Sequence, residues 1–344
     1  MTTQHLSPLT MLLSRHTRRR EFITLLGGAA ATWPLAARAQ QQATPVIGYL
    51  GSETPERWAT RLRAFRQGLT ETGYAEGNNV AIKFRWAEGR YDRFAPLAAE
   101  LVRQQVNVIA VPGSTPGALA VKAATATIPA VFYVGGDPVK LGLVGSLNRP
   151  GGNLTGVGAL NVELGGKQLE LLHELVPTAT DIALLLNPTN PALTDTQTRD
   201  AQAAARSLGL RVFVLHASTD DDIDEAFTTL GEKRAGALLV GADTFFYARP
   251  DKLAALAARY AVPTISAYRE FAAAGGLMSY GGSITDAHHQ VGLYTGRILK
   301  GDKPADLPVH QATKVELVIN LKTARMLGLA FPVTLLGRAD EVIE

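Results

Sequence analysis

Along most of this chain, short apolar runs alternate with longer stretches in which apolar residues recur at every third or fourth position. The first apolar run, residues 46–50, predicts a buried strand. Residues 57–71 follow, and Leu62, Phe65 and Leu69 share one side of the helix that this spacing predicts. The chain therefore begins its regular pattern with a strand followed by a helix.

The same alternation continues in two series. In the first series we predict strands at 80–86, 107–111, 130–134 and 154–157, and helices at 92–104, 116–125 and 138–147. In the second we predict strands at 181–186, 211–215, 235–240, 264–266 and 277–280, and helices at 164–175, 191–208, 221–230, 250–260 and 285–299. A β-rich tail at 310–319 precedes a last helix near 321–327. Continuous apolar strands that alternate with helices indicate α/β architecture with parallel sheets covered on both faces.

Two series of about five units each predict two similar Rossmann-like lobes. Residues 151–166 contain six glycines, which suits a flexible crossover between lobes, and 275–282 and 301–308 suit two more crossings. We therefore expect a first lobe of residues 44–157 plus about 283–305. The second lobe is expected to hold about 158–282 plus 306–344, with a hinge between the two.

The N-terminal residues have a composition of their own. The pair Arg19-Arg20 precedes an apolar stretch at 22–33, and small residues occupy 37–39. This order predicts a cleaved signal peptide over residues 1–39, since the apolar stretch is shorter than the ~20 residues that span a bilayer. The paired arginines resemble a twin-arginine signal. A general secretory signal, or an amphipathic N-terminal helix of a cytosolic protein, fits the same residues. We expect export to the periplasm.

Net charge and cysteine content exclude several classes of function. The formal net charge of the 344 residues is +3, but residues 1–39 hold five arginines and one acid. The remaining residues include 29 basic and 30 acidic side chains, so the exported chain carries about −1 and gives no electrostatic case for binding nucleic acid. The absence of cysteine excludes disulfides, thiolate catalysis and cysteine-bound metals.

Polar residues follow three strands of the expected first lobe. Ligands of open parallel sheets bind beyond the carboxyl ends of the strands, at helix N-termini. Ser52 follows the first strand, Ser114 and Thr115 follow the third, and Asp137 follows the fourth. Hydroxyls beside free backbone N–H groups can hold a carboxylate, and Asp137 can hold an ammonium or hydroxyl group. Thr115 and Asp137 also stand where a residue caps the next helix, and that alternative stays open.

The second lobe offers four candidates of the same kind. Asn187 follows the strand at 181–186, and Asp243 follows the strand at 235–240 with two phenylalanines close behind it. An acid beside aromatic rings suits a ligand with a cation and an apolar body, although a helix cap with packing aromatics fits equally. Tyr268 and Tyr280 lie at late strand ends and can add stacking surface.

Motifs for catalysis, nucleotides and metals are missing. The segment Gly165-Gly166-Lys167 lacks the first glycine of a P-loop, and no G-x-G-x-x-G, G-x-S-x-G or H-E-x-x-H occurs. His288 and His289 are adjacent, so on a helix they point about 100° apart and make a poor metal pair. We expect the seven histidines to face solvent. We therefore predict no catalytic residue, no metal and no cofactor.

Several stretches together resemble one protein family. They are residues 63–69 with Gly73, Tyr74 and 77–80, residues 132–144 with 149–156, residues 243–245, and residues 308–329 with the terminal 338–344. Over nearly all of the chain beyond the signal peptide, these residues are similar to ABC-transporter substrate-binding proteins of the tryptophan/tyrosine-type group. Gly135-Gly136 departs from the Val-Thr that this family often places before Asp137-Pro138, which removes a hydroxyl near the cleft.

The resemblance implies a type I periplasmic-binding fold and a non-enzymatic function. Such a protein captures a small molecule between two lobes that close by a hinge motion, and delivers it to an ABC permease in the inner membrane. The candidate cargoes are an amino acid or another aromatic or carboxylate compound. The resemblance implies a mostly monomeric chain, with a dimer as the other possibility.

Three other functions are weighed against this one. The effector domain of a regulator shares the fold but carries a helix-turn-helix, which this sequence lacks. An exported α/β enzyme would need an activated nucleophile or a metal cluster. A ligand-sensing receptor subunit for a signalling partner fits the same residues as a transport receptor.

Overall fold

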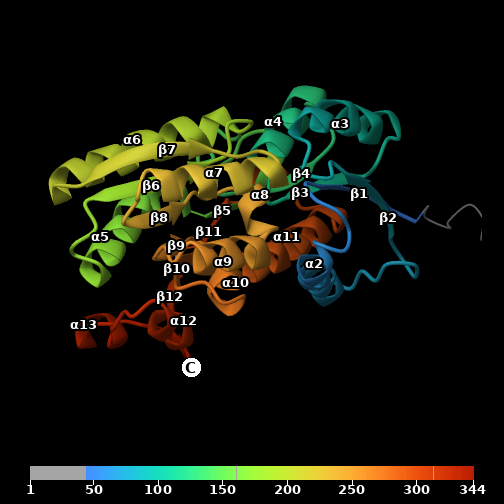
Figure 1. Cartoon of the computed structure of the whole chain (residues 1–344). Coiled ribbons are helices and arrows are strands. Elements are labelled where there is room, and N and C mark those ends of the chain that lie inside the picture. Colours follow the sequence, from blue (N-terminus) through green and yellow to red (C-terminus); the bar gives the residue numbers. More distant parts are fainter. Residues whose placement is uncertain (1–43, 160, 313) are drawn as a thin grey trace, which may run out of the picture. The chain divides into compact units, whose positions relative to one another are not determined.

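The computed structural model describes residues 44–159, 161–312 and 314–344. The expected signal peptide lies outside these described residues. Residues Pro45–Glu344 form one compact unit, in which the strands make two separate sheets (Figure 1). We call the six-stranded sheet with its helices the first lobe, and the seven-stranded sheet with its helices the second lobe.

The sheet of the first lobe is parallel throughout. Its order is β11-β5-β4-β3-β1-β2. The strands are β1 (Val46–Gly51), β2 (Ala81–Trp86), β3 (Val108–Pro112), β4 (Ala130–Val134), β5 (Leu154–Ala159) and β11 (His310–Ala312). The four inner strands are buried at almost every residue, which explains their unbroken apolar sequences. The edge strand β2 is partly exposed.

Helices cover both faces of this sheet. α2 (Ala59–Glu71) and α11 (Ile284–Leu299) pack on one face, and α3 (Phe94–Arg103) and α4 (Thr115–Ala124) on the other. Two 3-10 turns, η2 (Tyr91–Arg93) and η4 (Pro304–Asp306), complete the lobe. α2 and α11 lie side by side (Figure 1) at a distance that only glycine permits. A Cβ on Gly68 would lie 2.1 Å from the His289 carbonyl oxygen, and one on Gly292 would lie 2.1 Å from that of Phe65.

The sheet of the second lobe contains one antiparallel pair. Its order is β13-β12-β10-β9-β8-β6-β7, and β10 and β12 are the antiparallel neighbours. The strands are β6 (Asp181–Leu186), β7 (Arg211–His216), β8 (Ala237–Val240), β9 (Thr264–Ser266), β10 (Met278–Gly282), β12 (Val315–Asn320) and β13 (Glu341–Ile343). The expectation of parallel sheets therefore holds except where the chain returns in β12.

The second lobe is covered on both faces as well. α5 (Gly165–Leu175) and α6 (Pro191–Leu208) pack on one face, and α7 (Asp220–Glu232) and α9 (Pro250–Arg259) on the other. Shorter elements are η3 (Asn161–Leu164), α8 (Thr244–Tyr247), α10 (Arg269–Ala273), α12 (Leu321–Met326) and α13 (Val333–Leu336). In the described ranges, none of the helices has the length and apolar character needed to cross a membrane.

The chain passes between the sheets three times. The crossings follow β5, join β10 to α11, and join β11 to β12. The Asn161 side-chain oxygen accepts a hydrogen bond from the Gly282 N–H at 3.0 Å and so ties the first two crossings together. β11 pairs with β5, so residues 310–312 belong to the first sheet, whereas the expected division assigned 306–344 to the second. We propose residues 45–159 plus 284–312 as the first lobe, and 161–282 plus 315–344 as the second.

The helix expected over residues 138–147 is wrong. The segment forms turns, because the Asp137 carboxylate accepts the N–H groups of Val139 and Lys140 and closes the chain locally. Gly142 then takes φ +68°, which breaks any helix in progress.

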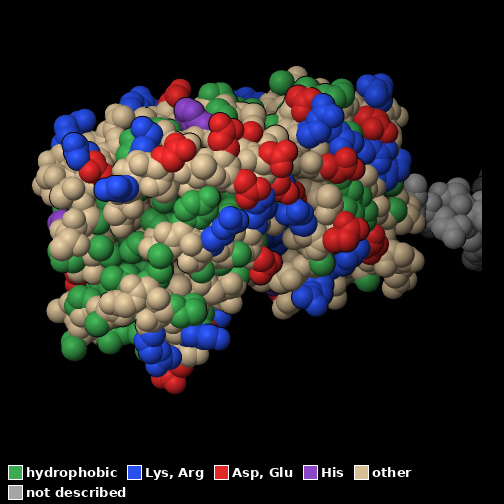
Figure 2. All heavy atoms as spheres, in the orientation of Figure 1, with side chains coloured by type: hydrophobic (Ala, Val, Ile, Leu, Met, Phe, Trp, Pro, Cys, Tyr) green, Lys and Arg blue, Asp and Glu red, His purple; other side chains and the backbone are tan. Residues whose placement is uncertain are grey.

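Charges of both signs intermix over the face of the molecule that Figure 2 shows. Lysine and arginine side chains alternate with acidic ones across this face, so it presents no extended field of one sign.

Candidate functional site

A small cavity lies between the lobes, at the carboxyl ends of β3, β4, β8 and β9. The first lobe contributes Trp58, Gly113, Thr115, Tyr133, Gly135, Ile284 and His288, and the second lobe contributes Leu193, Ala242, Asp243, Thr244, Tyr247 and Tyr268. We call it the interlobe cavity. Its free volume is about 20 Å³, which is room for about one water molecule. The lobes are therefore closed on each other in this structure.

The first-lobe wall carries three buried polar atoms without a hydrogen-bond partner among the described residues. They are Trp58 Nε1, Thr115 Oγ1 and His288 Nε2, and each residue is at most 3% exposed. Thr115 begins α4, whose N-terminus is capped by Ser114: its Oγ accepts the Gly117 N–H at 3.1 Å. A buried polar atom without a partner costs about 1–3 kcal/mol, so these atoms mark places where a ligand can bind.

His288 is held in one orientation. Its Nδ1 lies 2.9 Å from the Ile284 carbonyl oxygen, so Nδ1 carries the proton and Nε2 is an acceptor. The ring makes edge contacts with Trp58 and Tyr133, at centroid distances of 6.0 and 5.7 Å. Burial, together with the nearby positive charge of Arg61, lowers the pKa of His288 to about 3. The ring is therefore neutral at neutral pH.

Asp243 is the centre of a buried hydrogen-bond network. Its Oδ1 accepts from Tyr91 Oη at 2.7 Å, from Asn187 Nδ2 at 3.0 Å and from the Phe245 N–H at 2.9 Å. Oδ2 accepts from Asn190 Nδ2 at 2.8 Å and keeps capacity for one more donor. Tyr91 belongs to the first lobe, so this carboxylate joins the lobes. Desolvation and the negative charge of Asp243 raise the pKa of the Tyr91 hydroxyl, which keeps it a donor.

Two tyrosines form the second-lobe wall of the interlobe cavity. The rings of Tyr247 and Tyr268 lie 4.6 Å apart between centroids, and both side chains are buried. The Tyr247 hydroxyl donates to Glu270 Oε1 at 3.0 Å. On the other side of Tyr247 the Arg61 guanidinium carbon lies 3.6 Å from its ring centroid and 4.1 Å from that of Trp58. Arg61 thus joins an aromatic ring of each lobe by cation–π contact.

The segment 243–249, which contains α8, makes most of the polar contacts to the first lobe, and we call it the latch segment. Besides the Asp243–Tyr91 bond, Thr244 Oγ1 donates to the Gly113 carbonyl oxygen at 2.5 Å, and Arg57 donates to that of Ala248 at 2.9 Å. Arg249 forms an ion pair with Glu53 at 3.0 Å, and both side chains are largely buried. Burial raises the pKa of Glu53, although Arg249 opposes this shift.

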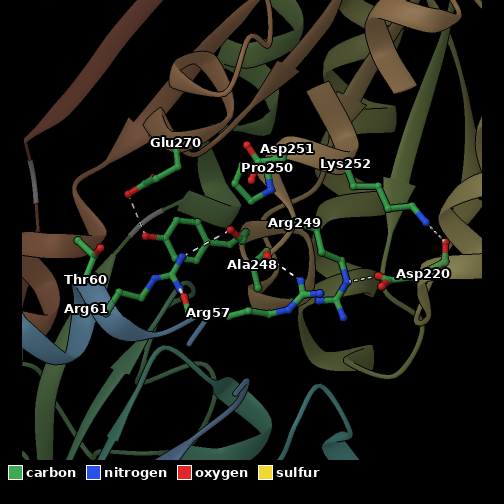
Figure 3. A pocket seen from close by; sticks show the side chains of 11 residues that line it. Arg57, Thr60, Arg61, Asp220, Ala248, Arg249, Pro250, Asp251, Lys252 and Glu270 are labelled. Carbon is green, nitrogen blue, oxygen red and sulfur yellow. Dashed lines mark hydrogen bonds and ion pairs between the residues drawn. The ribbon is translucent and has the colours of Figure 1, made fainter. Parts of the chain in front are cut away.

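A second, charged pocket of about 480 Å³ lies beside the latch segment (Figure 3). Arg57 reaches into it from the turn before α2 and Arg61 from α2 itself, and Arg249, Lys252 and Glu270 come from the second lobe. Figure 3 shows Arg249 directed at Asp220, with which it forms an ion pair, and Arg57 directed at the Ala248 carbonyl group. Most of these cations already have partners, so the interlobe cavity is the stronger candidate for a ligand.

The structure brings three of the eight candidate residues to the wall of the interlobe cavity: Thr115, Asp243 and Tyr268. Two more support this wall, since Ser114 caps α4 and Asn187 bonds to Asp243. Ser52 is fully buried after β1, and its hydroxyl has no partner among the described residues, but it does not line the cavity. Ligand contact by these residues stays a prediction.

The other two candidates lie elsewhere. Asp137 caps the turn after β4 and lines a separate pocket between the lobes, of about 560 Å³. Tyr280 packs on the core of the second lobe, and its carbonyl oxygen accepts from Gln168 at 2.8 Å. Asp137 follows β4, but its carboxylate accepts the N–H groups of Val139 and Lys140. Tyr280 lies within β10, and neither residue lines the interlobe cavity.

Four residues of the cavity that carry aromatic or imidazole rings were not expected from the sequence: Trp58, Tyr133, Tyr247 and His288. The expectation that the histidines face solvent is wrong for His288, which is fully buried on α11. Its position four residues after Ile284, on the apolar side of a long helix, was the available signal. In the described part of the chain, no group of three or more histidine and acidic side chains is arranged to hold a metal ion.

Comparison with known proteins identifies a family whose members resemble this chain. Residues 54–343 match the family model described as ABC transporter substrate binding protein. A tyrosine-binding protein of Clostridioides difficile (strain R20291) is 27% identical over 268 residues, which cover 78% of this chain and 76% of that protein.

Two solved structures are similar over most of the chain. A conserved domain protein of Vibrio cholerae matches with a TM-score of 0.79 and 26% identity, over 87% of this chain and 100% of that one. An ABC domain of Streptococcus pneumoniae in complex with L-Trp matches with a TM-score of 0.78 and 28% identity, over 88% and 100%. A glucose-galactose binding protein and LacI-type regulators, at 10–14% identity, share the fold alone, which is the type I periplasmic-binding architecture.

Proposed function

The chain belongs to the family of ABC transporter substrate-binding proteins, and from this premise we propose that it captures an aromatic amino acid between its lobes. Family membership also makes the chain a binding component of a transporter and not an enzyme. The observation that carries the proposed ligand is the interlobe cavity, whose walls hold four tryptophan and tyrosine rings and three unpartnered polar atoms. The tyrosine-binding relative and the L-Trp complex point to the same class of ligand.

The two lobes have different tasks in this proposal. In the first lobe, His288 packs against Trp58 and Tyr133, and Thr115 begins the capped helix α4, so this lobe offers a largely preformed wall to an incoming ligand. The second lobe brings Tyr247 and Tyr268 over that wall when the hinge closes. Because the closed cavity holds about 20 Å³, the lobes separate before an amino acid enters and close less far around it.

The polar ends of an amino acid fit groups at the rim. Thr115 Oγ1 lies at the N-terminus of α4, where a hydroxyl and the helix dipole favour a carboxylate. Asp243 Oδ2 has capacity for one more donor and suits an ammonium group. The aromatic side chain then lies against Trp58 and the two tyrosines of the second lobe.

We further propose that the chain works outside the inner membrane with a permease partner. Support comes from the predicted signal peptide at residues 1–39 and from the family. N-terminal sequencing of the protein recovered from a periplasmic fraction should begin at Gln40. Replacing Arg19 and Arg20 by lysine should block export if the twin-arginine route is used.

A thermal-shift screen tests the proposed ligand class. The panel contains the twenty amino acids, aromatic acids, sugars and purines. At 100 times its Kd, a ligand of the folded chain adds about 2.7 kcal/mol, which raises Tm by about 4 °C for a protein of this size. We expect this shift with tyrosine, tryptophan or both, and with no sugar.

Two variants locate the binding site in the same screen. Thr115→Val removes the hydroxyl at the first-lobe wall and should weaken binding about tenfold. Tyr280→Phe is the matched control, because its side chain lies on the second-lobe core, and it should bind as the wild type does. A shift with sugars and none with aromatic amino acids would contradict the proposed cargo.

A further inference from the structure

His288 lies in the first-lobe wall of the interlobe cavity, and one of its two ring nitrogens forms no hydrogen bond with the described residues. Its residue exposure is 0%, and Nε2 has no hydrogen-bond partner among the described residues. The bond between Nδ1 and the Ile284 carbonyl oxygen fixes the tautomer, so Nε2 can accept a hydrogen bond but cannot donate one.

The space beside this nitrogen is kept open by glycine. Gly113 has φ +85°, a conformation that favours glycine, and a Cβ there would lie 3.5 Å from His288 Cε1 and 3.7 Å from Nε2. No side chain from position 113 therefore covers the edge of the imidazole ring that carries Nε2. The same edge borders the interlobe cavity.

The surroundings of the ring are aromatic, and the indole N–H of the neighbouring Trp58 makes no hydrogen bond to Nε2. Trp58 and Tyr133 contact it edge-on, and Tyr247 and Tyr268 face it from the other lobe across the cavity. The charged group that acts on it most strongly, Arg61, has its guanidinium between Trp58 and Tyr247. A planar aromatic ligand is thus the natural occupant, and a hydrogen-bond donor on its ring is what Nε2 lacks.

We infer that His288 determines specificity by accepting a hydrogen bond from a ring N–H or O–H group of the bound ligand. The inference rests on the proposed capture of an aromatic amino acid and narrows it. The cleft then selects indole and phenol side chains over a plain phenyl ring, because a phenyl ring would leave Nε2 buried and unpaired.

Two matched ligand pairs test the inference by isothermal titration calorimetry on the purified chain. The first pair is tryptophan and 3-benzothienylalanine, in which sulfur replaces the ring N–H. The second pair is tyrosine and phenylalanine, which differ by the ring O–H. We expect the ligand with the donor to bind about 10- to 100-fold more tightly in the pair whose ring fits the cleft, which is the usual effect of leaving one buried acceptor unpaired.

The variant His288→Phe should reduce this preference to less than about threefold, while an aromatic ring stays against Trp58 and Tyr133. His289→Gln is the control. It neighbours His288 in sequence, but its side chain is 20% exposed and bonds to Glu71 at 3.0 Å, away from the cavity. Circular dichroism and thermal unfolding confirm that each variant is folded.

Equal affinities of the wild type for both members of each pair would overturn the inference and leave the proposed capture of aromatic amino acids intact. A preference that persists in folded His288→Phe would also overturn it, because another group would then accept the bond. Binding of none of the four probes would overturn the inference together with the proposed function.

Discussion

Polar residues at the lobe interface fall into two groups, according to whether their side chains find hydrogen-bond partners within the fold. Asp243 accepts four hydrogen bonds, one of them from the opposite lobe. Thr115 Oγ1 and His288 Nε2 have no partner among the described residues. The first kind holds the closed form together, and the second kind faces the cavity that a ligand would fill.

The pH dependence of stability reports on His288. Its pKa is lowered to about 3 in the folded chain, so the unfolded chain takes up a proton near the usual pKa of 6.5 and the folded chain does not. The contribution of His288 is fully present above pH 6.5 and is lost as the pH falls toward 3. Between pH 7 and pH 5 the free energy of unfolding should drop by about 2 kcal/mol from this residue.

Urea unfolding at both pH values measures this effect as the difference between the wild type and His288→Phe. The other titrating groups are common to the two proteins. The variant should lose about 2 kcal/mol less than the wild type on going from pH 7 to pH 5. Identical losses would mean that His288 takes up its proton in the folded chain, which is incompatible with its buried, neutral state.

Sequence reasoning at the residue scale found the positions that follow strands and missed those on helices. Thr115, Asp243 and Tyr268 come directly after apolar runs, so topology places them at the carboxyl edge of a sheet. Trp58 and His288 lie at one end of α2 and on α11, where an aromatic or imidazole ring has the spacing of a core residue. Which helix faces turn to the other lobe depends on how the lobes close.

At the scale of single elements, a short helix, α8, lies in the segment that joins the lobes. α8 is four residues long, and Asp243 begins it by accepting the Phe245 N–H. A helix of one turn has no apolar periodicity, so the sequence did not predict it. The longer elements were predicted with small errors. In α6 and α9, for example, proline at the first position and regularly spaced apolar residues indicate a helix.

The close contact of α2 and α11 gives a prediction at this scale. Gly292→Ala would place a methyl group 2.1 Å from the Phe65 carbonyl oxygen, which forces the two helices apart. We expect a loss of about 1–3 kcal/mol in the free energy of unfolding, measured by urea denaturation.

Gly166→Ala is the matched control for this substitution. It also lies in a helix, but its Cβ would lie 3.4 Å from the nearest atom, the Ala204 methyl group. Unfolding should show no loss, or a gain of up to about 1 kcal/mol from helix propensity. Equal losses in both variants would show that the α2–α11 contact is not what Gly292 provides.

At the scale of the whole molecule, alternating strands and helices were enough to predict two α/β lobes. The expected lobe boundary near residue 306 differs from the sheet pairing, because β11 is three residues long and pairs with β5 across the expected division. The antiparallel pairing of β12 with β10 was not predicted either. An apolar pattern identifies strands, but it does not encode their order or direction in a sheet.

The two-lobed arrangement explains why the sequence predicted residues on both sides of the interlobe cavity but not its complete lining. Each lobe supplies one wall, and the latch segment 243–249 joins the two lobes by hydrogen bonds and an ion pair. The central claim is that an aromatic amino acid binds between these walls and that the lobes close on it.

A crystal structure of the chain grown with saturating tyrosine or tryptophan tests this claim most directly. The account predicts the ring of the amino acid between the first-lobe wall of Trp58 and His288 and the second-lobe Tyr247 and Tyr268, with one molecule per chain. An amino acid bound outside the interlobe cavity, or closed lobes with no amino acid between them, would contradict it.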